Sequence, residues 1–269
     1  MHTATAAGRT FLDRGLLTSP NFAVGTVLMF PGGLIMTGTL ALLSTMLENL
    51  MNYPAMMTGL VTMPRAIGGF AAIFLVAPLI ARVDNRLIIL FGFLLTAFAM
   101  WQMSCFSLQM GMTPVIISGL VQGFGLDCTQ VPLNIMALST LPPHILTQGT
   151  AIRSEMRNLG GSIGISILVS QLAQNTQIVH ARLVEGLRPD NPLAHLPFLP
   201  APFSLSTPDG IAALNAEVTR QAAMVAYIDD FRLMMLIALG VLPLLVLLHG
   251  TREPQRAIST APAAAAADD

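Results

Sequence analysis

The sequence GTAIRSEMRNLGGSIGISILVSQLAQ, residues 149–174, sets the organisation of the whole chain. Its middle is a run of small residues, several of which recur at four-residue steps: Gly160, Gly161, Ser162, Gly164, Ser166 and Ser170. On a helix this spacing predicts one smooth face, where a second backbone can pack closely, as membrane helices do. We therefore expect Gly160, Gly161, Ser162 and Gly164 to be helix-packing residues.

Three charged residues, Arg153, Glu155 and Arg157, open the same stretch. The apolar part after them, Leu159 to about Val169, is too short to cross a membrane alone, because a span needs roughly 20 residues. Either the charged turns lie at membrane depth, or this stretch does not cross. If it crosses, we expect Arg157 to be buried or to face a cavity, and Arg153 to extend its long side chain to the membrane surface.

The composition is that of a membrane protein. Hydrophobic residues make up 54% and charged residues 10% of the 269-residue chain, and the mean hydropathy is +0.69. Soluble domains are nearer a quarter charged. The net charge of -1 and the absence of Lys leave no basic stripe, so nucleic acid is excluded as a partner.

The sequence carries no sign of catalysis, metal or cofactor. Cys105 and Cys128 lie far apart inside apolar runs and are interpreted as buried free thiols. No metal-protease, nucleophile-elbow or phosphate-binding motif is present in the sequence. We expect a protein that is not an enzyme, with no catalytic residues, no metal site and no cofactor.

Six stretches are long enough to cross a membrane: residues 21–47, 54–81, 87–108, 114–139, 149–174 and 231–249. Residues 149–174 must be among them, since otherwise the last span and the arginines after it would change sides. The predicted fold class is therefore an all-α membrane protein, a six-transmembrane-helix bundle.

Arginines give the predicted orientation and domain order. They gather in the short turns on one side, which places both termini in the cytoplasm of a multi-pass cell (inner) membrane protein. The predicted segments are a cytoplasmic lead-in, five spans, a long outer loop with a short amphipathic helix from Pro208, the last span, and a disordered cytoplasmic tail. Their ranges are 1–20, 21–174, 175–228, 229–250 and 251–269.

Polar side chains interrupt two of these spans. Arg65 lies about eleven residues into the second, and the fourth carries a stripe of four polar residues over three turns: Gln122, Asp127, Gln130 and Asn134. Such residues face a bundle interior or a water-filled cavity, because facing lipid is costly. Two interpretations stay open: the stripe lines a substrate or proton pathway, or it hydrogen-bonds neighbouring helices. With Glu155 and Arg157, these residues are the candidate pathway set.

Six segments, in this order, resemble a known family: NFAVGT, GLVTMPRAIGG, LIARVDNRLII, SGLVQGFG, VPLNIMALSTLPP and RNLGGSIGIS. The chain is similar to the C-terminal half of the fourteen-helix drug:proton antiporters of the major facilitator superfamily. The resemblance covers about residues 10 to 250.

The resemblance implies roles for particular residues. Arg82, Asp84 and Arg86 match a basic-acidic turn that acts as a gate hinge in the family. Pro64, Arg65 and Gly68 match a P-R-x-x-G stretch, which makes Gly68 a further helix-packing candidate. The sequence departs from the family pattern at Asp127, Arg153 and Glu155, where neutral residues are usual, and at Ala77 or Ala81, where Gly is usual.

The implied function is small-molecule or multidrug efflux coupled to protons, by rocking of this bundle against a second one. The implied partners are the lipid bilayer, a small hydrophobic or drug-like substrate, protons, and a missing N-terminal half or partner subunit. The alternative is a transport-inactive truncated membrane protein, or a half-transporter that needs a partner bundle.

Overall fold

The computed structural model describes residues 20–139, 141–142, 145–185 and 207–247. Helices account for nearly all of them, and no strand occurs in these ranges. The helices are α2 (Pro20–Asn49), α3 (Ala55–Thr62), α4 (Pro64–Ile80), α5 (Asn85–Met103), α6 (Met112–Leu138), α7 (Leu146–Glu185), α8 (Pro208–Gly240) and the short 3-10 helix η4 (Leu242–Leu247). The predicted all-helical class is confirmed.

Three helical segments of the described chain are long and apolar enough to cross a membrane: Asn21–Asn49, Ala55–Ile80 and Asn85–Met103. The second joins α3 and α4, which are separated only by a break at Met63, before Pro64. Pro64 has no backbone N–H, and its fixed φ suits the first turn of a new helix. Six spans remain a prediction, because α6, α7 and α8 carry more polar residues.

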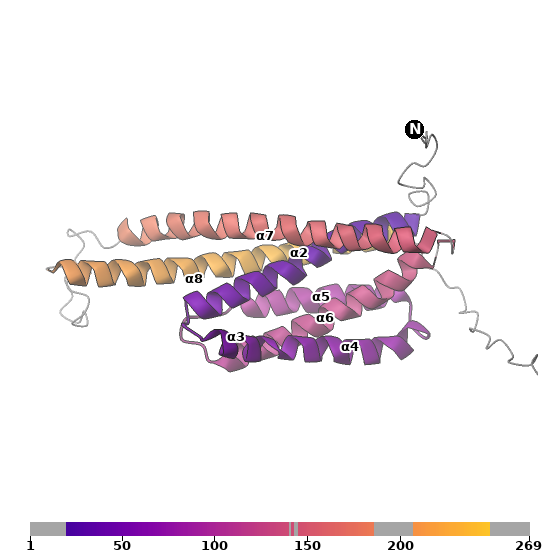
Figure 1. Ribbon diagram of the computed structural model, residues 1–269, viewed down its shortest axis with the longest axis horizontal. Helices are drawn as coiled ribbons and strands as arrows, with labels where there is room; N and C mark the ends of the chain where they lie inside the picture. The colour runs from indigo at the N-terminus through magenta and orange to yellow at the C-terminus, as the bar shows by residue number, and fades with distance from the viewer. Residues whose placement is uncertain (1–19, 140, 143–144, 186–206, 248–269) are drawn as a thin grey trace, which may run out of the picture.

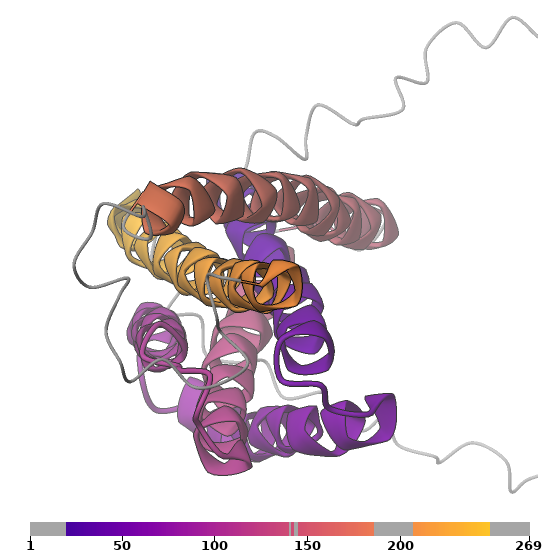
Figure 2. The same cartoon turned by 90° about the vertical axis from the view of Figure 1, so that its left-hand side faces the viewer.

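The helices lie side by side along the long axis of the molecule (Figure 1). The most extensive contacts join α2 to α7, α5 to α6, and α4 to α6, while α8 packs against α7 and α5. Seen along the helices, α7 and α4 lie on opposite sides of the bundle (Figure 2). At one end, α7 and α8 continue together beyond the other helices (Figure 1).

Glycines set the closeness of α2 and α7. A Cβ atom added to Gly160 would overlap the carbonyl oxygen of Phe30, and one added to Gly164 would lie 2.6 Å from Cγ of Leu34. The reverse holds at Gly33, where a Cβ atom would overlap the carbonyl oxygen of Arg157. Gly160 and Gly164 of α7 and Gly33 of α2 therefore lie where the two helices approach each other most closely.

The serines of the same run lie elsewhere. Ser162 and Ser166 are exposed, and their hydroxyls donate to carbonyl oxygens one turn back in α7. Each residue turns a helix by about 100°, so Ser162 points about 200° away from Gly160. The expectation that Ser162 shares the glycine face is wrong, because equal four-residue steps that start two residues apart lie on opposite sides.

The other predicted packing glycine lies between α4 and α6. A Cβ atom at Gly68 would overlap the carbonyl oxygen of Leu120, and one at Gly123 would overlap that of Arg65. Backbone-to-backbone contact thus holds both of these helix pairs, α2 with α7 and α4 with α6.

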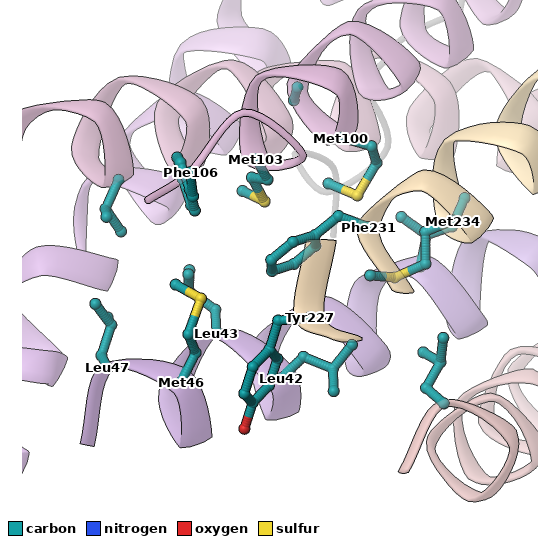
Figure 3. Packing of buried hydrophobic residues seen from close by; sticks show 14 of the residues in the cluster. Leu42, Leu43, Met46, Leu47, Met100, Met103, Phe106, Tyr227, Phe231 and Met234 are labelled. Carbon is teal, nitrogen blue, oxygen red and sulfur yellow. The ribbon is translucent and has the colours of Figure 1, made fainter. Parts of the chain in front are cut away.

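The largest apolar core joins α2, α5 and α8 (Figure 3). Phe231 is fully buried and meets Phe106 edge-on, with ring centroids 6.1 Å apart. Methionines from all three helices fill the remaining space with no exposed surface: Met46, Met100, Met103 and Met234. The unbranched, flexible methionine side chain suits such irregular apolar gaps.

Helices occupy both ends of the predicted long loop, residues 175–228. α7 continues to Glu185, and α8 begins at Pro208 with the Thr207 hydroxyl accepting from the Gly210 amide. α8 then runs without interruption to Gly240, so the amphipathic helix and the start of the predicted last span are one helix. The proline-rich part of the loop, the lead-in before Pro20 and the tail after Leu247 lie outside the described residues.

Candidate functional site

The polar stripe of α6 divides between neighbouring helices. The carboxylate of Asp127 lies against Gly69 of α4, whereas the amide of Gln130 lies against Gly32 of α2. Gln122 has no exposed surface, and neither amide atom has a hydrogen-bond partner among the described residues. Asn134 is exposed. The four polar side chains of the stripe therefore have different surroundings and do not meet in one cluster.

Arg65 bridges α4 and α2. Its Nη2 atom donates a hydrogen bond of 3.0 Å to the carbonyl oxygen of Met36. Asp127 is near enough to interact with Arg65 electrostatically. The two do not form an ion pair within 4 Å; in the described part of the chain, such pairs are Arg220 with Glu217 and Arg232 with Asp229.

A cavity of about 150 Å³ lies between α6 and α7, at the start of α7. One apolar residue, Met29 of α2, borders it, and the rest of its lining is polar: Gln130, Asn134, Thr150, Arg153, Ser154 and Arg157. Three members of the predicted pathway set, Gln130, Asn134 and Arg157, thus come together. Drug-sized ligands occupy pockets of roughly 300–1,000 Å³, so this cavity alone does not hold such a ligand.

Of the two arginines of the cavity, Arg153 lies in a different environment from the one expected from the sequence. Arg153 is only 3% exposed, and its Nη1 atom donates a hydrogen bond of 3.1 Å to the carbonyl oxygen of Asn134. Its Nε and Nη2 atoms are buried without a partner in the described chain. Arg157 lines the cavity as predicted but is exposed. The expectation that Arg153 reaches the membrane surface is wrong.

The signal for Arg153 was present in the sequence. The buried residues of α7 include Gly149, Arg153, Gly160 and Gly164, which follow one another at steps of four, seven and four. These steps keep one helix face. Arg153 is thus on the packed side of the helix, and its distance from the helix end does not decide its exposure.

Asp230 is a second buried charged group that sequence reasoning missed. It has no exposed surface, and neither carboxylate oxygen has a hydrogen-bond partner among the described residues. It follows Tyr227, also buried, by one turn of α8. An ionisable residue buried in a membrane bundle is by default a candidate functional residue.

The remaining predicted residues lie outside the cavity. Glu155 is exposed on α7 and is in neither of the ion pairs of the described chain. Asp84 is the N-cap of α5, and its Oδ1 accepts a hydrogen bond of 3.1 Å from the Arg86 amide. Arg82 is exposed in the same turn. This turn has a clear structural role in starting α5; its gating role remains a prediction.

Comparison with known proteins identifies the relatives. The Multidrug export protein EmrB of Haemophilus influenzae is 28% identical over 249 residues, which are 90% of this chain and 48% of that protein. The Multidrug export protein EmrB of Escherichia coli is 30% identical over 188 residues, or 68% of this chain and 36% of that protein. The chain is a homologue of the EmrB/EmrY-type multidrug export proteins.

The EmrB/EmrY-type relatives confirm the resemblance to the drug:proton antiporters of the major facilitator superfamily. The Probable multidrug resistance protein EmrY of Escherichia coli is 28% identical over 82% of this chain and 44% of its own length. The chain therefore spans less than half the length of these relatives, which is consistent with one half of such a protein. No family model matches the chain.

Proposed function

We propose that this chain is the C-terminal, six-span half of a multidrug or small-molecule efflux transporter that exchanges its substrate for protons. One observation carries the proposal: 90% of the chain matches a protein named as a multidrug exporter. The helical bundle supports it, because three candidate spans pack against further helices of 27, 40 and 33 residues, each long enough to cross. The bundle is multi-pass in the cell (inner) membrane, with both termini cytoplasmic.

Transport by this half requires a second bundle. The outer face of α3 and α4 is apolar and exposed, with Met56 at 79% and Phe74 at 77% of their full accessible surface. Such a face suits lipid or a partner bundle. Substrate sites in such transporters lie between two halves. The proposed role of this half is to rock against the other and to contribute buried polar groups to the pathway.

The pathway groups proposed here come from α4, α6, α7 and α8. Gln122 and Asp230 are fully buried without hydrogen-bond partners in the described chain, and polar groups are costly in that state unless a ligand, water or proton reaches them. Asp127 is a carboxylate close to Arg65. A carboxylate that gains and loses a proton is the usual relay in proton-coupled membrane transport.

Co-expression tests the proposal. The chain is produced with the part of the Haemophilus influenzae relative that it does not match, in a bacterial strain that lacks its own multidrug exporters. We expect resistance to a panel of unrelated drugs only when both parts are present. Sensitivity that stays unchanged, with both parts inserted in the membrane, contradicts the proposal.

Variants in the same assay test the residues. Asp127→Asn and Arg157→Ala are expected to abolish resistance, while the matched control Arg182→Ala, exposed on the far part of α7, keeps it. Resistance that survives both the Asp127 and the Arg157 substitution refutes their assigned roles and leaves the transporter assignment standing.

We infer that the proposed half-transporter has no activity of its own. The partial coverage of the relatives, 36% to 48% of their lengths, favours it over a self-sufficient transporter. The chain expressed alone separates the two: drug resistance from the chain alone indicates a self-pairing transporter, whereas resistance only after co-expression indicates a half that needs its partner.

A further inference from the structure

The cavity between α6 and α7 has a marked excess of positive charge. Arg153 and Arg157 contribute two guanidinium groups, and no carboxylate is among its lining residues. The ion pairs of the described chain involve neither arginine. Arg157 also lies close enough to Arg153 for the two like charges to repel each other. Burial of an unpaired charge is costly, so this arrangement favours an anion in the cavity.

The hydrogen-bonding groups of Arg153 lead to the same conclusion. Only Nη1 has a partner, the Asn134 carbonyl oxygen, while Nε and Nη2 are buried and unpartnered in the described chain. These two nitrogens form one edge of the guanidinium, and such an edge binds the oxygens of a phosphate or carboxylate with two parallel hydrogen bonds. Both nitrogens are covered by protein, so the side chain must turn toward the cavity when an anion enters.

The other lining groups complete a wall rich in hydrogen-bond donors. Thr150, Arg153, Ser154 and Arg157 follow one another at steps of three, one and three, which places all four on one face of α7. Gln130 of α6 also borders the cavity. The volume of about 150 Å³ is that of a cavity known to accept a benzene-sized molecule. It therefore suits a single oxyanion group.

We propose that this cavity is a binding site for a phosphate oxyanion, held between Arg153 and Arg157. Two positive charges favour phosphate over a singly charged carboxylate. Arg153 is seven residues from the start of α7, or about 10 Å along the helix. At this depth either a lipid headgroup phosphate or free inorganic phosphate can reach it. The site does not depend on the proposed transport activity.

Binding of inorganic phosphate to the full chain, purified in detergent, tests the first source. Calorimetric titration is done at constant ionic strength, with chloride as the reference anion. We expect saturable binding, with a dissociation constant that rises at least tenfold in Arg153→Gln and in Arg157→Gln. The control Arg182→Gln removes an exposed arginine from the same helix and is expected to change it less than twofold.

Lipid retention tests the second source. The chain is purified from bilayers that contain phosphatidylcholine and phosphatidylglycerol, and native mass spectrometry measures the lipids that remain bound. We expect retention of the anionic phosphatidylglycerol by the unmodified chain and by Arg182→Gln, with at least a tenfold loss in the two cavity variants. Arg157 is exposed, so Arg157→Gln keeps the test decisive if Arg153→Gln fails to fold.

Each outcome decides the proposal. Arginine-dependent binding of inorganic phosphate alone identifies free phosphate as the source, and arginine-dependent retention of phosphatidylglycerol alone identifies the lipid headgroup. If neither anion binds, or if both bind equally well to Arg157→Gln, the proposal is overturned. Loss or gain of drug resistance leaves all of these results unchanged.

Discussion

Adding a single methyl group at Gly160 should push α2 and α7 apart. In Gly160→Ala the new Cβ atom would overlap the carbonyl oxygen of Phe30 and lie 2.9 Å from its Cα atom, so it meets rigid backbone. A flexible side chain could turn away, but a helix backbone must move as a whole. Overpacking of this kind costs about 1–3 kcal/mol.

The same substitution at Gly59 isolates this steric cost. Gly59 lies in α3 with nothing within 4 Å of an added Cβ atom. Alanine is favoured over glycine in a helix by about 1 kcal/mol, and this gain applies at both positions. Gly59→Ala should therefore keep or raise the free energy of unfolding. The free energy of unfolding of Gly160→Ala should be about 1–3 kcal/mol lower than that of Gly59→Ala.

Unfolding in detergent micelles measures the difference. The purified chain is titrated with sodium dodecyl sulfate, and helix content is followed by circular dichroism. Both variants must have the same helix content before the titration, so that unfolding starts from the same fold in each. If Gly160→Ala proves as stable as Gly59→Ala, the close approach of α2 and α7 at Phe30 is wrong.

Three further expectations follow from the core, the thiols and the surface. Phe231→Ala removes a fully buried ring between α2, α5 and α8 and should cost about 3–5 kcal/mol in the same unfolding assay. The expectation that both thiols are buried is wrong for Cys105, which is exposed, so a maleimide in detergent should label Cys105 and should leave the buried Cys128 unlabelled until the chain is unfolded. Hydrogen bonds from Arg220 hold the pKa of Glu217 below its ordinary value of 4.5. The stability from this pair is therefore present above about pH 4.5 and is lost as the pH falls through the lower folded-state pKa; Glu217→Gln should flatten the acid side of the stability profile.

The elements that the sequence predicts well are those defined by composition and by strong local signals. Thr207 before Pro208 predicts the start of α8, and the structure begins the helix there with the expected cap. Pro64 marks the break between α3 and α4. Gly160 and Gly164 predict a close helix contact, because only glycine leaves room for a neighbouring backbone.

Boundaries inside long helices are harder to predict. Asp229, Asp230 and Arg232 suggested the edge of a span, yet α8 passes through them without a break. Charged side chains do not interrupt helical hydrogen bonds. They indicate where a helix leaves apolar surroundings and not where the helix ends. Even that inference fails at Asp230, which is fully buried among the helices.

Arg153 and Arg157 show why the candidate site was only partly predictable. Distance from a helix end, which the sequence gives directly, predicts that Arg153 is the more solvated of the two. The direction in which a side chain faces is independent of that distance and follows from the whole pattern of the helix. Arg153 shares the buried face of α7 with Gly149 and Gly160, so neighbouring helices cover it although it is nearer the helix end. For charged residues in such bundles, both the position along the helix and the direction of the side chain must therefore be known before a transport or binding role is assigned.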